Sequence, residues 1–342
     1  MKVRTIGKPF ALALLMLMAL VTVPRSAAPV PPAGRVVRLG LLFGISPSFD
    51  PSANPIHRAL VEGLRAHGYE PGRNIVFEFR SAQGNPERLP GLAAELARLK
   101  VDVLVTFFTV ATLAAREATQ TVPIVMVGAA DPVGTGLVAS LARPGGNITG
   151  LGVNAAEISA KRVQLLQEAV PRLSRVAVLW NSTLKSMALG FQQIELAAPS
   201  LGVTVQSVRV SGSADFDQAF AAIGQARPGG LIVLFGPMRG NDLPRIVEFV
   251  TRNRLPTVFE LGQGVRGGGL MEFGPNLSEL GRQVGGYIDK IVNGAKPADL
   301  PVEEPTKFEL VINLKAARTL GLPIPQSLLL RADRVVEEPN GR

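Results

Sequence analysis

The sequence of 342 residues contains no cysteine, and this absence removes several kinds of chemistry at once. Disulfide bonds, thiolate catalysis, cysteine-ligated zinc, iron–sulfur clusters and a lipid anchor on cysteine are all excluded. Histidine is nearly as scarce, because only His57 and His67 are present. A histidine-rich metal site is therefore excluded, and a Ser-His-Asp triad has few candidates. Both histidines fall on one predicted helix, where we expect them to lie at the surface.

Long apolar runs are absent beyond the N-terminus, where one run has the pattern of an export signal. Three cations precede fourteen uncharged residues at Phe10–Val23, and small residues follow up to Ala28. This run is short for a spanning helix and typical of a signal peptide. Pro29 disfavours a cut directly after Ala28, so cleavage elsewhere before Arg35 and a retained anchor both stay open. We expect a periplasmic protein, and we leave residues 1–34 out of the fold argument.

An excess of positive charge gives the chain a formal net charge of +9, from 36 Lys and Arg against 27 Asp and Glu. Four of these cations belong to the first 28 residues, so the remainder carries 9 less 4, or +5, spread thinly. No run of Lys and Arg is interleaved with aromatic residues, and no nucleic-acid motif occurs. We therefore expect no nucleic-acid partner, because a basic isoelectric point alone describes solubility.

From Arg35 onward, short apolar runs alternate with helical patterns. The first half contains predicted strands at Val36–Phe43, Asn74–Arg80, Val101–Phe107 and Pro123–Val127. The second half contains predicted strands at Arg175–Trp180, Val203–Val210, Leu231–Phe235, Thr257–Glu260 and Gly269–Phe273. Apolar strands separated by helices are typical of parallel sheets built from right-handed βαβ units. The predicted fold class is α/β, with two doubly wound parallel-sheet lobes rather than a solenoid of repeats.

These patterns also predict a division into domains. Residues 1–34 form the signal peptide and linker, residues 35–150 the first lobe, and residues 151–271 the second. A late helix near 272–296 begins after Asn276, with Glu279 as capping-box partner, and we expect it to return to the first lobe. The lobe that holds the C-terminal segment, 297–342, stays open.

Ligands of open α/β sheets bind beyond the carboxyl ends of the strands, and this rule selects a set of loops. The candidate ligand-binding residues in them are Ser46, Thr109, Val110, Ala111, Asp131, Asn181 and Glu260. The hydroxyls of Ser46 and Thr109, with the N–H groups after Thr109, can bind a carboxylate. Asp131 or Glu260 can pair with an ammonium. An apolar wall can come from Phe107, Phe108, Phe235 or Phe259. The alternative is structural: Ser46 and Thr109 cap helices, and Asp131 shapes the turn before Pro132.

The catalytic motifs in this sequence are incomplete. Gly262, Gly264 and Gly267 match a dinucleotide fingerprint, but the following residues read as a strand instead of the phosphate-binding helix, so a flexible connector is expected. Ser182 with Lys185 is a weak nucleophile candidate, since no GxSxG elbow and no KTG motif occur. We expect no enzyme activity, no catalytic residues, no cofactor and no metal.

Several long stretches resemble the ABC-transporter substrate-binding proteins related to tryptophan- and branched-chain-amino-acid-type periplasmic receptors. They include DPVGTGLVASLARPGGNITG and SAKRVQLLQEAVPRLSRVAVLWN, and the likeness extends over about Arg35–Glu337. The resemblance implies a type I periplasmic-binding-protein fold, with two lobes, a three-strand hinge and a cleft lined by the loops named above. Where the family commonly has a small-residue turn, this chain has Phe107-Phe108-Thr109, which affects the size of the ligand.

The resemblance and the export pattern together favour a monomeric solute receptor. It would close its two lobes on an amino acid or similar small carboxylate and deliver it to an ABC permease in the inner membrane. Two alternatives stay open from the sequence. One is a sensor that signals through a membrane kinase, and the other is an exported hydrolase whose nucleophile the sequence does not reveal.

Overall fold

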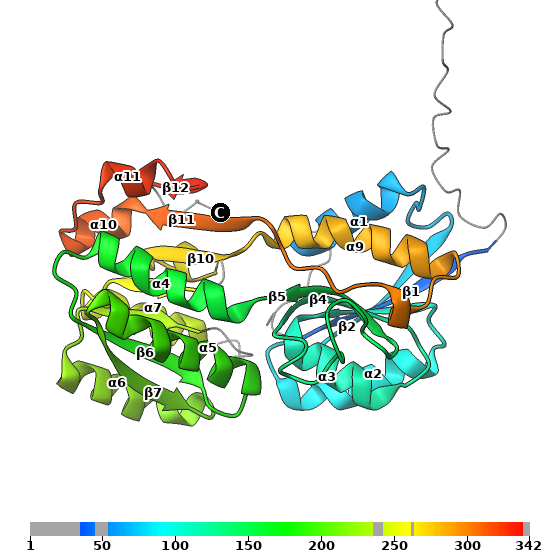
Figure 1. Cartoon of the computed structure of the whole chain (residues 1–342), viewed down its shortest axis with the longest axis horizontal. Coiled ribbons are helices and arrows are strands. Elements are labelled where there is room, and N and C mark those ends of the chain that lie inside the picture. Colours follow the sequence, from blue (N-terminus) through cyan, green and yellow to red (C-terminus); the bar gives the residue numbers. More distant parts are fainter. Residues whose placement is uncertain (1–34, 45–53, 235–241, 261–262, 338–342) are drawn as a thin grey trace, which may run out of the picture.

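The computed structural model describes residues 35–44, 54–234, 242–260 and 263–337. These residues form two sheet-centred halves that lie side by side along the longest axis of the molecule (Figure 1). The expected α/β class with parallel sheets in two lobes is confirmed. The predicted signal segment and Ser46 lie outside the described residues.

The first half is built on a parallel sheet of five strands in the order β2-β1-β3-β4-β5. These strands are β1 (Val37–Phe43), β2 (Ile75–Ser81), β3 (Val103–Phe107), β4 (Ile124–Ala130) and β5 (Ile148–Val153). The four predicted strands are confirmed, and the sequence pattern missed β5. Two glycines interrupt its apolar pattern, and one of them is required: a Cβ on Gly150, whose φ is +120°, would stand only 2.8 Å from the backbone nitrogen of Met126.

Helices cover both faces of this first sheet. One face packs against α1 (Pro55–Ala66) and α9 (Leu277–Val292), and the other packs against α2 (Leu89–Arg98) and α3 (Phe108–Ala118). Asparagine caps begin α1 and α9: the Asn54 side chain accepts from the N–H groups of Ile56 and His57, and Asn276 accepts from Glu279 N–H at 2.9 Å. The predicted Asn276 cap of the late helix is thereby confirmed. The expected capping-box bond from Glu279 is not formed, because the Asn276 N–H donates to the Lys307 carbonyl and the Glu279 carboxylate accepts from Arg282 and Gln283.

The second half contains a sheet of seven strands in the order β12-β11-β10-β9-β8-β6-β7. Its strands are β6 (Arg175–Asn181), β7 (Thr204–Val210), β8 (Gly230–Val233), β9 (Thr257–Phe259), β10 (Met271–Pro275), β11 (Phe308–Asn313) and β12 (Arg334–Val336). Every pair is parallel except β10–β11, which is antiparallel. That pair corrects the expectation of a purely parallel sheet, because β11 enters the sheet from the opposite end.

Helices also sandwich the second sheet. One face packs against α4 (Ala155–Ala169), α5 (Lys185–Ala197), α10 (Leu314–Leu320) and α11 (Gln326–Leu329), and the other against α6 (Phe216–Ala226) and α7 (Asp242–Arg252). A one-turn helix, α8 (Gln263–Arg266), precedes β10. Short 3₁₀ turns complete the chain: η1 (Pro86–Arg88), η2 (Ala198–Leu201), η3 (Ser213–Asp215) and η4 (Pro297–Asp299).

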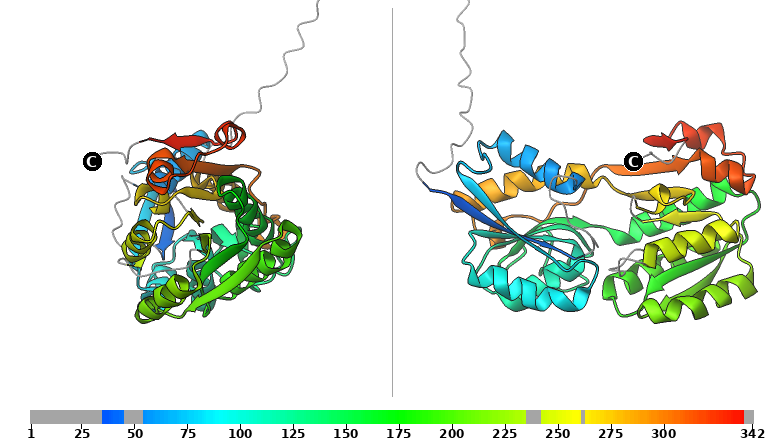
Figure 2. Two further views of the ribbon diagram at one scale, coloured as in Figure 1. Left: turned by 90° about the vertical axis from the view of Figure 1, so that its left-hand side faces the viewer. Right: turned by 180° about the vertical axis from the view of Figure 1, so that it is seen from behind.

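The chain passes between the two sheets three times within the described residues (Figure 1). The first passage runs from β5 into α4, and the second runs from β10 into α9, which packs on α1. The third follows η4, where Glu303 bridges to Leu151 of β5, and leads into β11. All three passages lie on the same side of the molecule, as the two further views show (Figure 2).

Two sequence expectations are wrong at the level of packing. His57 is 9% exposed rather than a surface residue, because its ring packs edge-on against Phe77 and Phe79 of β2. The glycine-rich segment after β9 is not a loose connector either. Gly264 and Gly269 lie so close to the ring of Phe259 that a Cβ on either would overlap it. These glycines allow close packing.

Candidate functional site

The two halves share one strand order, and this fixes where a ligand site belongs. The first sheet reads β2-β1-β3-β4-β5, and the first five strands of the second read β7-β6-β8-β9-β10. The chain winds in opposite directions from β1 and β3, and again from β6 and β8, so each sheet has a switch point between those strands. Crevices for ligands form beyond the carboxyl ends of strands at such points. Thr109 follows β3 and Asn181 ends β6, so both lie at a switch point.

Thr109 is buried in the first turn of α3, and its hydroxyl has a structural partner. The Oγ1 atom accepts a hydrogen bond of 2.9 Å from the backbone N–H of Ala130, which joins α3 to the end of β4. Within α3, Ala111 is buried and Val110 is partly buried, with a methyl near Gly44 at the end of β1. The end of β1 at Gly44, the start of α3 and the end of β4 therefore meet at one edge of the first sheet.

Asp131 lies at this same edge with a strained backbone. Its φ is 42°, in the left-handed region that aspartate tolerates better than most residues. Its Oδ1 accepts from the N–H of Gly134 at 2.9 Å, and its own N–H donates to Val153 at 3.0 Å. The carboxylate therefore shapes the turn that leads away from β4.

A cavity of about 370 Å³ lies between the two halves. The first half contributes Pro86 and Glu87 of η1, and the second half contributes the ends of β6 and β7 with the loops that follow them. Its lining from the second half is Asn181, Thr183, Leu184, Val210, Ser211, Gly212, Ser213, Phe216 and Asp242. Asn181 is thus the one described candidate that lines this cavity, whereas Thr109, Asp131 and Glu260 do not.

Several polar groups lie in the loops around this cavity. The Oδ1 atom of Asn181 accepts from both the N–H and the hydroxyl of Thr183, at 2.9 and 2.7 Å, which holds its amide in place. Asp242 is 4% exposed at the first turn of α7. The hydroxyl of Ser213 is buried and has no hydrogen-bond partner among the described atoms. Carboxylates, an oriented amide and an unpaired hydroxyl suit a small polar ligand.

Sequence reasoning missed Glu87 and the residues around Ser213. They follow β2 and β7, the second strand of each half, and the rule that ligands bind beyond carboxyl ends of parallel strands applies to these loops as well. A signal was therefore present in the sequence. Two of the four phenylalanines expected to form an apolar wall lie in the core, because Phe107 and Phe259 are at most 1% exposed. Phe108 is partly buried with its ring near Gly128, and Phe235 lies outside the described residues.

Glu260 follows β9 at the same edge of the second sheet, and its carboxylate faces a buried cation. Oε1 stands 3.6 Å from Nη2 of Arg162, whose side chain is 2% exposed against 18% for Glu260. Arg162 projects from α4 and also donates from Nε to the carbonyl oxygen of Phe273, at 2.9 Å. Nothing in the helical pattern around Arg162 distinguishes it from a surface arginine, so the sequence gives no signal for this contact.

Burial shifts the pKa values of Arg162 and of the neighbouring Glu272. Burial lowers the pKa of the Arg162 guanidinium, while the charges of Glu260 and Glu272 act in the opposite direction. Burial also raises the pKa of Glu272 to about 7, with the negative charge of Glu309 as the second cause. Arginine stays protonated at neutral pH even so. The base of β10 therefore holds a permanent cation beside a carboxyl group that titrates near neutrality.

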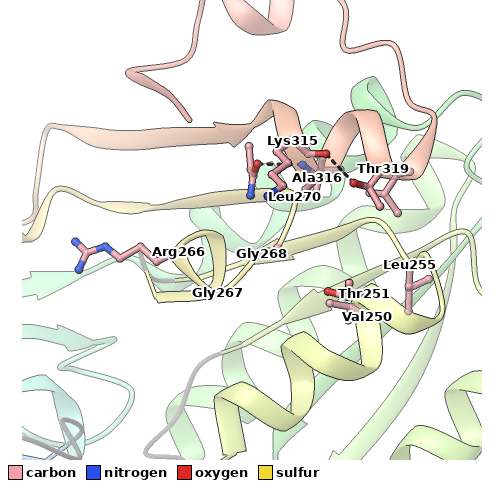
Figure 3. A pocket seen from close by; sticks show the side chains of 13 residues that line it. Val250, Thr251, Leu255, Arg266, Gly267, Gly268, Leu270, Lys315, Ala316 and Thr319 are labelled. Carbon is pink, nitrogen blue, oxygen red and sulfur yellow. Dashed lines mark hydrogen bonds between the residues drawn. The ribbon is translucent and has the colours of Figure 1, made fainter. Parts of the chain in front are cut away.

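A second pocket, of about 240 Å³, lies between α7, the glycine-rich segment and α10 (Figure 3). Two of its polar side chains form hydrogen bonds with α10. The Thr319 hydroxyl donates to the Lys315 carbonyl at 3.0 Å, and Asn313 accepts from the Ala316 N–H at 3.0 Å. Arg266 extends away from the other labelled side chains. The lining of this pocket comes from the second half alone, whereas both halves line the other cavity, which is therefore the better candidate site.

Within residues 35–44, 54–234, 242–260 and 263–337, no three His, Asp or Glu side chains gather in a way that would hold a metal ion. No helix within the same ranges is long and apolar enough to cross a membrane.

Comparison with known proteins adds a family and several relatives. The family described as ABC transporter substrate binding protein matches residues 48–336. A tyrosine-binding protein of Clostridioides difficile is 25% identical over 279 residues, which cover 80% of this chain and 78% of that protein.

Two solved structures are similar along their whole length. A conserved domain protein from Vibrio cholerae has a TM-score of 0.81 and 28% identity, covering 88% of this chain and 100% of that one. The ABC domain from Streptococcus pneumonia in complex with L-Trp also has a TM-score of 0.81, with 25% identity and the same two coverages.

Proposed function

Because this chain belongs to the ABC transporter substrate-binding protein family, we propose that it is the exported receptor of an ABC importer and binds an amino acid between its two halves. One observation carries this proposal: the cavity of about 370 Å³ has walls from both halves, with Glu87 on one side and Asn181 on the other. A ligand that contacts both walls stabilises the arrangement in which they approach each other. The binding residues we propose are those predicted at the two sheet edges, together with this lining.

The chemistry of the two edges supports an amino acid as the ligand. At the first edge, Thr109 opens α3, whose first N–H groups suit a carboxylate. Asp131 beside it, and Glu87 and Asp242 around the cavity, supply the negative charge that an ammonium requires. The relatives bind tyrosine and L-Trp, so we propose an aromatic or other apolar amino acid for this chain as well.

Closure of the two halves is part of the proposal. The three passages between the sheets lie side by side and can bend together as a hinge, while each half keeps its own core. We propose that residues 35–150 with α9 move as one lobe and that residues 151–271 move as the other. The strands and helices from β11 onward lie on the second sheet and would move with it.

The remaining features of the proposal follow from the family. Delivery of the solute requires an ABC permease in the inner membrane as partner, and this requires export to the periplasm. We propose that the receptor acts as a monomer and carries out no catalysis. Its role is then completed by binding and release alone.

Ligand binding can be tested by differential scanning fluorimetry and isothermal titration with the twenty amino acids, simple sugars and aromatic acids. A ligand that binds only the native state raises its stability by about 2.7 kcal/mol when present at 100 times its Kd. We expect L-tryptophan, L-tyrosine or another apolar amino acid to raise the melting temperature, and sugars to have no effect. A sugar that binds while every amino acid fails would reject the proposal.

A pair of glycine variants tests the location of the site. Gly212 lines the cavity, has an extended backbone, and nothing lies within 4 Å of the position its Cβ would take. Gly212→Phe therefore places a ring at the cavity without disturbing the fold, and we expect it to abolish binding. Gly146→Phe is the matched control, because Gly146 also has open space around its Cβ but lies on the first half outside the cavity lining. Equal affinity in both variants would move the site elsewhere.

A further inference from the structure

Arg162 is among the largest side chains that the fold buries completely. It is 1% exposed, although it projects from a helix that is otherwise rich in polar residues. Burial of a charged group costs several kcal/mol unless partners compensate, and removal of one partner is strongly destabilising. The lining of the cavity between the halves does not include Arg162. Its position therefore requires an explanation other than direct contact with that cavity.

The guanidinium contacts two elements in different directions. Its Nε donates to the carbonyl oxygen of Phe273, and its Nη2 stands 3.6 Å from Glu260 Oε1. Strands β9 and β10 pair only at Met271 and Glu272, so Phe273 lies beyond their ladder. Arg162 thus binds the backbone of β10 just beyond the point where its pairing with β9 ends.

These contacts link the hinge to the edge of the second sheet. Helix α4, which carries Arg162, follows the first passage between the halves, and β10 leads into the second passage. Glu260 follows β9 at the edge where Asn181 ends β6, two strands farther along, or about 10 Å away at 4.8 Å per strand. One buried side chain therefore joins the elements next to two passages to a carboxylate at the carboxyl-end edge of the second sheet.

We propose that Arg162 is a positioning residue for ligand binding, which holds the Glu260 carboxylate toward the ammonium of an amino acid and ties that carboxylate to strand β10. The proposal rests on the function proposed above. Glu260 retains 18% exposure, so a ligand can reach it while Arg162 holds its buried side. A ligand ammonium at Glu260 would then act on β10 through a single guanidinium, which connects occupancy of the cleft to the hinge.

Lysine cannot replace arginine in this role. A guanidinium presents donors in a planar fork and bonds two acceptors in fixed directions, whereas an ammonium is a point charge on a flexible chain. Arg162→Lys keeps the buried charge and loses the simultaneous contacts with Phe273 and Glu260. It therefore separates positioning from charge balance, and it is less disruptive than Arg162→Met.

Glu272 supplies a readout that a purely structural role of Arg162 would not affect. The charged groups that face it are Glu309 on β11, Arg334 on β12, Arg266 at the end of α8 and Arg162 on α4. When Glu272 ionises, it competes with Glu260 for Arg162, and the Glu260 carboxylate gains negative character toward the ligand. Affinity for an amino acid should then rise between pH 6 and pH 8. Glu272→Gln should remove this rise.

The binding experiment compares L-tryptophan with indole-3-propionate, which lacks the ammonium, by isothermal titration. We expect Arg162→Lys and Glu260→Gln each to lower the affinity for L-tryptophan at least tenfold. Their affinity for indole-3-propionate should stay within threefold of the wild-type value. The double variant should be no weaker than Glu260→Gln alone. Arg331→Met is the control, because Arg331 forms an exposed ion pair with Glu168 in the same half. Wild-type affinity in Arg162→Lys, or equal loss for both ligands, would overturn the proposal.

A ligand-free measurement separates this proposal from the proposed function. Hydrogen–deuterium exchange at 257–260 and 271–275 should be at least tenfold faster in Arg162→Lys than in Arg331→Met. Unchanged exchange there would refute the tie between Arg162 and β10. Failure of wild-type protein to bind L-tryptophan or any other amino acid contradicts the proposed function, and it also removes the ligand-positioning role while the exchange result decides the structural tie.

Discussion

Gly63 of α1 lies against the backbone carbonyl of Arg282 in α9, so closely that a Cβ on Gly63 would overlap that oxygen. A Cβ on Gly285 would in turn stand 2.5 Å from the carbonyl carbon of Gly63. Two helices separated by more than 200 residues therefore meet backbone to backbone through glycine. This contact fixes where the second passage of the chain ends, because α9 can sit this close to α1 only with glycine at both positions.

Gly63→Ala should destabilise the protein by about 3 kcal/mol, because the new methyl forces α1 and α9 apart in a packed interface. Gly286→Ala is the matched control in α9, since the nearest atom to its Cβ would be His67 Nε2 at 3.5 Å, an ordinary contact. That change should be neutral or stabilising by up to about 1 kcal/mol, from helix propensity. Urea denaturation measures both, and equal effects would contradict the close approach at Gly63.

Thr109→Val should cost about 1–3 kcal/mol of folding free energy, because the Ala130 N–H loses its acceptor at a partly buried position. Thr109→Ser keeps the hydroxyl and should cost less than the valine variant. Chemical denaturation of the two variants provides the comparison. Equal stability of Thr109→Val and wild type would show that water replaces the hydroxyl.

Asp131→Asn distinguishes a role of the Asp131 side chain in the turn from a role in ligand binding. An asparagine Oδ1 can still accept from the Gly134 N–H, so the melting temperature should change little. If the carboxylate faces a ligand ammonium in a desolvated cleft, affinity should fall by about 2–5 kcal/mol. Isothermal titration with the amino acid identified by the screen measures this loss. A change in Kd below threefold would show that Asp131 stabilises the turn and does not bind the ligand.

Glu272 should make the stability of the protein depend on pH. Its pKa is raised to about 7 in the native state, so between about pH 4.5 and pH 7 the folded protein binds the proton more tightly than the unfolded chain. Its contribution to stability is therefore present below pH 4.5 and is lost as the pH rises through 7. The free energy of unfolding of Glu272→Gln, relative to that of wild type, should rise by on the order of 2 kcal/mol from pH 5 to pH 8.

Urea denaturation at the two pH values tests this expectation. Glu117→Gln is the control, because Glu117 is an exposed residue paired with Arg116 on the first half. Its difference from wild type should be the same at both pH values. A constant difference for Glu272→Gln as well would contradict the raised pKa.

Closure of the two halves should be visible in solution. Small-angle X-ray scattering with a saturating amino acid should give a smaller radius of gyration than the ligand-free protein, because both walls of the cavity approach the ligand. The Gly212→Phe variant should show no such change at the same ligand concentration. A scattering curve that stays constant for wild-type protein at verified saturation would argue against closure.

Much of the fold is encoded by patterns that are local along the chain. Alternating apolar strands and helices predict the α/β class, and Asn276 with Glu279 predicts the start of α9. These features could be read because periodicity and capping depend on residues a few positions apart. The strand β5 was missed for the same reason: Gly150 weakens the local pattern, although its contact with Met126 requires a glycine.

The order of strands and helices along the chain predicts the edges at which the candidate residues lie, because carboxyl ends of parallel strands meet at one edge. The partners of those residues depend on how distant segments pack. Glu87 approaches the loop of Asn181, and Arg162 is buried against Glu260, across about 100 residues of chain in each case. The physical reason is that strand order and helix placement set these distances, and a single buried arginine has the same local pattern as one exposed to solvent.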